Sequence, residues 1–110
     1  MKKHFLPLPE IPEQELAPGF HARLIHMNGA TIGHVTAKEG AILPSHHHIH
    51  EQVTNIISGE LEMTVAGETK LCKAGDTVII PGNVPHSAVA KTECYLIDVF
   101  HPVREDYKAR

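Results

Sequence analysis

From residue 21 onward the chain offers short apolar runs separated by glycine, proline and asparagine, and no run keeps the apolar period of a helix. Three dipeptides place a glycine where a tight hairpin turn needs a positive φ, namely Asn28-Gly29, Ser58-Gly59 and Ala66-Gly67. The pattern predicts strands over residues 22–27, 30–38, 46–57, 60–66, 68–72, 77–80, 86–90 and 93–101. Seven or eight short strands indicate an all-β fold that closes into a barrel.

The two ends of the chain differ from this middle part. Residues 1–20 contain four prolines, which remove backbone donors and disfavour helix, so we expect an extended N-terminal arm. Residues 21–101 would then form the β-barrel, and residues 102–110 a charged C-terminal tail. The arm carries apolar side chains that a second copy of the chain can cover, namely Phe5, Leu6, Leu8 and Ile11. We therefore expect a homodimer.

Charge and composition argue against several kinds of partner. The net charge is -3 with histidines neutral, and the ten basic residues are scattered, so the basic patch of a nucleic-acid-binding protein is missing. The N-terminal segment is interrupted by prolines and contains Glu10 and Glu13, unlike a secretory signal, and no membrane-spanning segment is predicted. Without an export signal we expect Cys72 and Cys94 to stay reduced, in a cytoplasmic protein.

Residues 46–52 read His-His-His-Ile-His-Glu-Gln, and His86 follows a Pro-Gly-Asn-Val-Pro turn. Imidazole is the commonest protein ligand for transition metals, and alternate residues of a strand face the same way. An extended run would project four side chains from one face, those of His46, His48, His50 and Gln52. The run is internal and interrupted, unlike an expression tag. We therefore predict a divalent transition metal, which these ligands do not restrict to one of nickel, zinc, manganese, iron or cobalt.

The spacing of these residues resembles the two motifs of the cupin superfamily. The first motif is formed by Gly40, His46, His48, Gln52 and Gly59. The second is formed by Gly75, Pro81, Asn83 and His86. The resemblance implies a double-stranded β-helix, or jelly-roll, barrel. The chain departs from the usual motifs at Gln52, where glutamate is common, at Asn83, where glycine is common, and at Ala90, where asparagine is frequent.

A neutral amide at position 52 changes the electrostatics of such a site. Three imidazoles and an amide oxygen leave a divalent ion with its formal charge of about +2, whereas a carboxylate would cancel part of it. An octahedral preference also leaves two positions open for water or substrate oxygens. The site is therefore expected to attract a small anionic ligand.

The last predicted strand places a carboxylate in an apolar setting. Asp98 shares a strand face with Leu96 and Phe100, and burial there would raise its pKa unless it is paired. One interpretation is a structural hydrogen bond or an ion pair with Arg104, with Phe100 as part of the core. The other is a functional carboxyl group. The residues alone leave both open.

The ending Asp-x-Phe-x-Pro-x-Arg-Glu-Asp is similar to that of the KdgF group of cupins, which convert ring-form 4,5-unsaturated uronates to linear keto acids in pectin and alginate breakdown. The resemblance implies catalytic roles for Asp98 and Arg104 and a pocket-lining role for Phe100. It also implies four metal ligands, namely His46, His48, Gln52 and His86. His50 remains a candidate ligand, substrate contact or proton shuttle.

Three functions are compatible with these residues. The first is a metal-dependent isomerase of carbohydrate metabolism that opens and ketonises a uronate, a small sugar acid. The second is a metal-dependent oxygenase, for which three histidines and two open positions on iron suffice. The third is a non-enzymatic sugar-binding or sensing module, because a fold does not fix a function.

Overall fold

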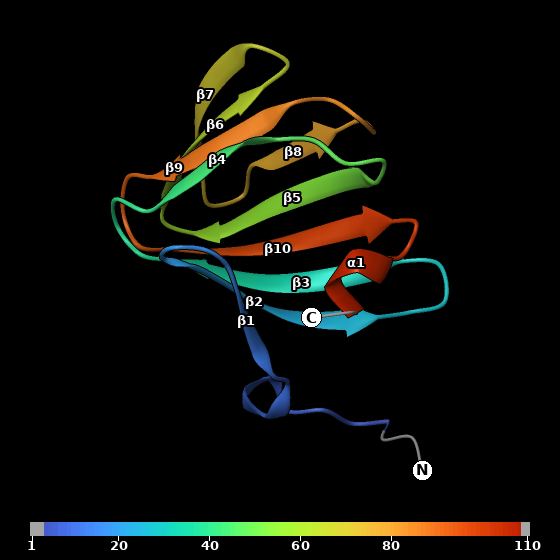
Figure 1. Cartoon of the computed structure of the whole chain (residues 1–110). Helices are drawn as coiled ribbons and strands as arrows, with labels where there is room; N and C mark the ends of the chain where they lie inside the picture. Colours follow the sequence, from blue (N-terminus) through green and yellow to red (C-terminus); the bar gives the residue numbers. More distant parts are fainter. Residues whose placement is uncertain (1–3, 109–110) are drawn as a thin grey trace.

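The computed structural model describes residues 4–108, whose strands form two antiparallel sheets that face each other (Figure 1). The larger sheet has the strand order β1-β2-β3-β10-β5-β8, and the smaller has the order β4-β9-β6-β7. The strands are β1 (Glu13–Ala17), β2 (Phe20–His26), β3 (Thr31–Ala37), β4 (Ile42–His46), β5 (Glu51–Ser58), β6 (Glu60–Val65), β7 (Glu68–Lys73), β8 (Thr77–Ile80), β9 (His86–Ala90) and β10 (Cys94–His101). The all-β jelly-roll barrel expected from the sequence is confirmed.

Two short helices lie outside the sheets. The 3-10 helix η1 (Leu8–Glu10) precedes β1, and the helix α1 (Glu105–Lys108) follows β10. Among residues 4–108, no helix is long and apolar enough to cross a membrane.

Strand register divides the inner face of the larger sheet into cross-strand rows. One row is entirely apolar and consists of Ala22, Val35, Leu96 and Ile56. The next row along the strands consists of Leu24, Gly33, Asp98, Thr54 and Val78. The row after that consists of His26, Thr31, Phe100, Gln52 and Ile80. Polar side chains therefore gather at one end of the barrel interior, and the apolar core occupies the other.

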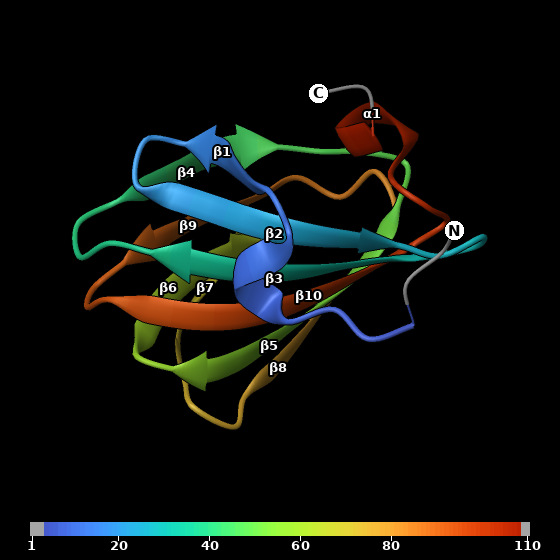
Figure 2. The same ribbon diagram turned by 90° about the horizontal axis from the view of Figure 1, so that it is seen from below.

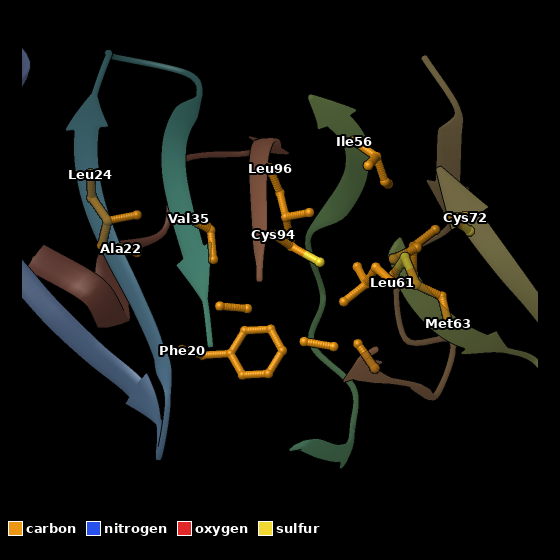
Figure 3. Packing of buried hydrophobic residues seen from close by; sticks show 14 residues of the cluster. Phe20, Ala22, Leu24, Val35, Ile56, Leu61, Met63, Cys72, Cys94 and Leu96 are labelled. Carbon is orange, nitrogen blue, oxygen red and sulfur yellow. The ribbon is translucent and has the colours of Figure 1, made fainter. Parts of the chain in front are cut away.

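The apolar end is closed by side chains from both sheets. Phe20 is 1% exposed and packs among Val35 and Leu96 of the larger sheet and Leu61 and Met63 of the smaller one (Figure 3). Burying such side chains contributes roughly 1.5–3 kcal/mol each relative to leaving them in water. This cluster fixes the spacing of the two sheets, and with it the position of the polar end.

The predicted positive φ is confirmed at two of the three turn glycines, because Gly59 and Gly67 have φ angles of 87° and 84°. At Gly59 a Cβ atom would lie 2.1 Å from the carbonyl oxygen of Glu93, so only glycine fits the turn between β5 and β6. Asn28-Gly29 also forms the predicted hairpin, with Met27 N–H donating to the Ala30 carbonyl oxygen at 2.7 Å, but Gly29 is not among the glycines of positive φ.

The prediction of one strand over 46–57 is wrong. β4 ends at His46, where it pairs with β9 of the smaller sheet, and β5 begins at Glu51 in the larger sheet. Residues 47–50 therefore cross between the sheets in irregular backbone. The four candidate ligands of this run do not share one strand face, as an extended strand would require. They approach one another because the chain changes sheets.

The expected arm is also more closely packed than predicted. Residues Glu13–Ala17 pair with β2 as an edge strand, and Ile11 is only 7% exposed. The Arg23 guanidinium, on the outer face of β2, donates to the backbone carbonyls of Pro9 and Ile11. Figure 2 shows η1 lying in front of β2 on this outer face. The prediction of an unpacked arm is therefore wrong for residues 11–17, and the expected tail includes helix α1.

Candidate metal centre and the pocket beside it

Three histidines from separate segments meet at the polar end of the barrel. His46 closes β4, His86 opens β9 directly opposite it, and His48 lies in the crossing between the sheets. The imidazole ring centroids of His46 and His86 are 4.2 Å apart, and those of His48 and His86 are 5.0 Å apart. One nitrogen from each ring lies within 4.8 Å of the others. These three of the four predicted ligands are thus brought together.

The backbone fixes the orientation of all three rings. Each Nδ1 atom lies within hydrogen-bond distance of a backbone carbonyl oxygen two residues away. The acceptors are Pro44 at 2.8 Å, His50 at 3.0 Å and Val84 at 2.8 Å. Because a carbonyl oxygen only accepts, each Nδ1 must carry the proton, and each neutral ring presents its Nε2 lone pair. This arrangement is typical of histidines that bind a metal.

Burial keeps the ring nitrogens of His48 and His86 in the form that binds a cation. The pKa of His48 is lowered to about 4, mainly by burial and then by the nearby Arg104 guanidinium. Burial also lowers the pKa of His86, whose Nε2 atom is buried without a hydrogen-bond partner among the described residues. A buried lone pair without a donor is costly. The three histidines therefore fit a divalent transition metal.

Gln52 adds an oxygen beside this cluster. It is 7% exposed, and its Oε1 atom lies 3.1 Å from His48 Nε2. The other end of the amide, Nε2, donates to Thr54 Oγ1 at 2.9 Å. The side-chain oxygen is therefore turned toward the histidines, as expected for a fourth ligand.

Asp98 is buried next to Gln52 and belongs to the same hydrogen-bonded chain. Thr54 Oγ1 donates to Asp98 Oδ1 at 2.7 Å, because β5 and β10 place the two residues opposite each other. Burial raises the pKa of Asp98 from 3.8 to about 6, and hydrogen bonds from Thr54 and Gln52 limit the rise. The expected burial is confirmed, but the setting is polar rather than apolar, because Thr54 and Gln52 contact the carboxyl group. A carboxyl group with this pKa can both release and take up a proton near neutral pH.

Arg104 lies over the same end of the barrel, and its side chain is held on every side. Its Nε and Nη2 atoms donate to the two carboxylate oxygens of Asp106 at 3.0 and 2.7 Å, and only 5% of the residue is exposed. The guanidinium carbon lies 3.8 Å from the ring centroid of Tyr107 and 4.8 Å from that of Phe100. The Arg104 backbone N–H donates to Thr31 Oγ1 at 2.9 Å. Arg104 thus pairs with Asp106, rather than with Asp98.

These groups surround a pocket of about 340 Å³. Five predicted site residues line it, namely His46, Gln52, Asp98, Phe100 and Arg104. The remaining lining residues are Leu16, Leu43, Pro44, Ser45, Asp106 and Tyr107. The pocket therefore offers a cation-binding edge, a buried carboxyl group, a guanidinium and apolar walls, which suits a small polar anion.

Of the two predicted substrate contacts, Phe100 lines the pocket and His50 does not. Phe100 is 4% exposed and meets the His48 ring edge-on, with 5.9 Å between the centroids. His50 is buried behind His48, with 5.4 Å between the ring centroids, and its carbonyl orients His48. His50 does not line the pocket, which argues against a direct substrate contact.

Sequence reasoning missed four residues of the site. Thr31 and Thr54 hold Arg104 and Asp98, and Asp106 and Tyr107 enclose the Arg104 guanidinium. The spacing of two between residues 52 and 54 was a usable signal for Thr54, because both face inward on β5. The other three contacts depend on how the chain folds back after β10.

Comparison with known proteins agrees with the jelly-roll fold. Residues 33–100 match the family model described as Cupin domain. The chain is 32% identical over 110 residues to the pectin degradation protein KdgF of Dickeya dadantii strain 3937, a match that covers 97% of this chain and 99% of that relative.

Two solved structures are similar over nearly the whole chain. An RmlC-like cupin from Shewanella frigidimarina NCIMB 400 has a TM-score of 0.88 and 30% identity, with 96% of each chain covered. KdgF from Halomonas sp. has a TM-score of 0.86 and 28% identity, with coverage of 96% of this chain and 99% of that one. Since the domain model spans more than half of the chain and KdgF of Dickeya exceeds 30% identity, the protein belongs to the cupin family and is similar to KdgF along almost its entire length.

Proposed function

We propose that this cupin is a metal-dependent isomerase that opens the ring of a 4,5-unsaturated uronate and converts it to a linear keto acid. The observation that carries the proposal is the placement of a buried carboxyl group and a buried guanidinium around the pocket that His46 of the histidine cluster and Gln52 also line. Similarity to KdgF, a pectin degradation protein, supports a sugar acid as the substrate class.

The metal would be held by His46, His48 and His86 through their Nε2 atoms and by Gln52 through Oε1. When bound, a divalent ion supplies positive charge that stabilises negative charge developing on a substrate oxygen. The four neutral ligands leave that charge uncancelled. Nickel, zinc, manganese, iron and cobalt all accept such ligands.

Arg104 would bind the substrate carboxylate. Its pair with Asp106 uses Nε and Nη2, and the guanidinium has a further amine, Nη1, for a charge-assisted hydrogen bond to the substrate. Packing against Tyr107 and Phe100 holds the guanidinium plane in place. The substrate would therefore enter with its carboxylate toward Arg104 and its ring against the apolar wall.

Asp98 would move the protons. Ring opening removes the hydrogen of the C1 hydroxyl, forms the C1 carbonyl and breaks the bond from C1 to the ring oxygen, which becomes the oxygen of an enol at C5. Protonation at C4 then gives the C5 ketone, so the reaction is redox-neutral. The Asp98 carboxylate accepts the hydroxyl proton and returns a proton to C4, a role that suits its pKa of about 6.

The test follows the ultraviolet absorbance of the conjugated double bond in a 4,5-unsaturated uronate. Metal-loaded protein should speed the loss of this absorbance over an enzyme-free control, and Asp98→Asn should lower the rate by roughly 10²–10⁴-fold. Glu39→Gln, an exposed carboxylate on the loop after β3, is the matched control and should retain the rate. Decay equal to the enzyme-free control would rule out this activity. Oxygen uptake during turnover would favour an oxygenase instead.

We also propose that the protein is a homodimer in the cytoplasm. An apolar row crosses the outer face of the larger sheet and consists of Ile25, Ile32, Val99, Val53 and Ile79. The same chain presents Phe5, 89% exposed, on the segment that leads to this face (Figure 2). A second copy would cover both surfaces at once. The two buried cysteines are free thiols, which favours a reducing compartment.

Light scattering tests the dimer. Wild-type protein should have twice the monomer mass, and Ile79→Lys, at a side chain that is 67% exposed, should shift the mass toward the monomer. Leu71→Lys, at an exposed position of the smaller sheet, is the control and should stay dimeric. A monomeric wild type would contradict the proposal.

A further inference from the structure

One hydroxyl group connects the candidate metal ligand Gln52 with the candidate acid and base Asp98. Thr54 Oγ1 lies 2.9 Å from Gln52 Nε2 and 2.7 Å from Asp98 Oδ1, and the residue is 1% exposed. A threonine hydroxyl has one hydrogen to donate and lone pairs to accept. The hydroxyl can therefore donate to only one of its two neighbours, and the other must donate to it.

The chemistry of the neighbours decides which one receives it. An ionised carboxylate only accepts, so the Thr54 hydrogen is directed to Asp98. The Thr54 lone pair then faces Gln52, and only the NH₂ end of that amide can donate to it. The NH₂ end of Gln52 also contacts the Asp98 carboxylate, and the oxygen end is consequently turned toward His48.

The opposite amide orientation would compete with a metal. His48 Nδ1 donates its proton to the carbonyl of His50, so the Nε2 atom of the neutral ring is a bare acceptor. If the Gln52 amide rotated by half a turn, its NH₂ group would donate to His48 Nε2, and both side chains would be engaged with each other. In the observed orientation the Gln52 oxygen and the His48 nitrogen, 3.1 Å apart, present two lone pairs that a shared cation would satisfy.

We propose that Thr54 is a positioning residue that fixes the Gln52 amide with its oxygen toward the histidines. The inference rests on the metal site of the proposed function and is independent of the uronate chemistry. The sheet register supports the role, because it places Thr54 between Asp98 on β10 and Val78 on β8. Because β5 is paired on both sides at Thr54, the backbone of three strands fixes the position of the hydroxyl.

Metal affinity in the absence of substrate tests this role. Competition of the protein with a chromophoric chelator for Co²⁺, at pH 8, should show that Thr54→Val weakens binding by roughly 10–100-fold. Valine keeps the side-chain shape but removes the hydroxyl. Thr54→Ser, which keeps the hydroxyl, is the matched control and should stay within about threefold of wild type. The Co²⁺ absorption spectrum should change in Thr54→Val and be retained in Thr54→Ser.

A second background separates amide orientation from a general structural effect. Gln52→Glu replaces the amide by a carboxylate whose two ends are both acceptors, so its orientation no longer matters. Thr54→Val should therefore cost much less affinity in Gln52→Glu protein than in wild type. If Thr54→Val does not fold, Thr54→Ala, which removes the same hydroxyl, is used in its place in both backgrounds.

Each outcome bears on a different part of the account. Wild-type affinity in folded Thr54→Val, or an equal loss in the Gln52→Glu background, overturns the role of Thr54 alone. Tight Co²⁺ binding that depends on Thr54, in a protein without uronate activity, leaves this inference standing and overturns the proposed reaction. A wild-type protein that binds no Co²⁺ overturns both.

Discussion

The two ends of the barrel interior are built on the same strands and are buried to the same degree, yet they are stabilised in different ways. At one end Val35, Leu96 and Ile56 are 1–4% exposed, and at the other Thr54, Gln52 and Asp98 are 1–7% exposed. Burial stabilises the first group, whereas it imposes a desolvation cost on the second unless hydrogen bonds replace those to water. Equal burial thus marks a core at one end and a site at the other.

The polar end is kept in place by its hydrogen-bonded chain. Gln52 donates to Thr54 and Thr54 donates to Asp98, with donor and acceptor atoms 2.9 and 2.7 Å apart, and the Gln52 oxygen lies 3.1 Å from His48 Nε2. These contacts do not fully offset the desolvation of Asp98, because its pKa remains raised. A buried carboxyl group of this kind is a feature that stability alone does not favour, which points to a chemical role.

The largest effect on stability is expected at the apolar end. Leu96→Ala removes a side chain that is 4% exposed within the core, and it should lower the free energy of unfolding by about 2–5 kcal/mol. Urea denaturation measures the change. Ile97→Ala, on the opposite face of the same strand, is the control and should cost clearly less. Equal losses at the two positions would mean that the inner face is not the core.

At Asp98, two residues further along β10, a substitution should raise the free energy of unfolding instead of lowering it. The raised pKa of Asp98 means that its contribution to folding is fully present below pH 3.8 and is lost as the pH rises through about 6. A rise from 3.8 to about 6 corresponds to about 3 kcal/mol. Asp98→Asn, which removes the charge, should therefore stabilise chelator-treated protein at pH 8 by up to about that amount.

The pH dependence of this difference is the check. Urea denaturation of wild type and Asp98→Asn should give nearly equal free energies of unfolding at pH 4, where Asp98 is largely protonated. His48 titrates in the same range with the opposite sign, and comparing the two proteins cancels its contribution. If the difference in free energy of unfolding between the two proteins does not vary between pH 4 and pH 8, Asp98 does not have a raised pKa.

A smaller effect is expected from Arg104→Lys, at the mouth of the polar end. Lysine keeps the charge but cannot donate in the two-pronged geometry that Arg104 uses toward Asp106. The KM for the uronate should rise by about tenfold, with a smaller change in kcat, because the residue binds the carboxylate in both ground and transition states. Arg23→Lys, on the outer face of the barrel, should leave KM unchanged. An unchanged KM in Arg104→Lys would place the carboxylate elsewhere.

The facing of the residues on β10 was more predictable from the sequence than the path of the chain around the histidines, for physical reasons. Alternation along 93–101 already places Leu96, Asp98 and Phe100 on one face, since a strand has a fixed period of two. Family motifs indicated the four candidate ligands and Arg104. The change of sheets after His46 was missed, because histidine-rich sequence has no strong preference between strand and loop.

The partners of the site residues were harder to predict than the residues themselves. Thr54 meets Asp98 because two strands distant in sequence pair in a particular register. Asp106 meets Arg104 only because the chain turns into α1 beneath Phe100, and Thr31 anchors that turn from β3. Such contacts are set by tertiary packing, so local composition contains little information about them.

Metal removal and restoration test the central claim most directly, namely that the polar end is a metal-dependent ketonising site. The rate of absorbance loss of a 4,5-unsaturated uronate is measured with purified protein, with chelator-treated protein, and with treated protein after one equivalent of divalent metal is added back. The rate should fall to the enzyme-free value on chelation and return with metal, and His48→Ala should prevent the return. Full activity in metal-free protein, verified by elemental analysis, would contradict the account.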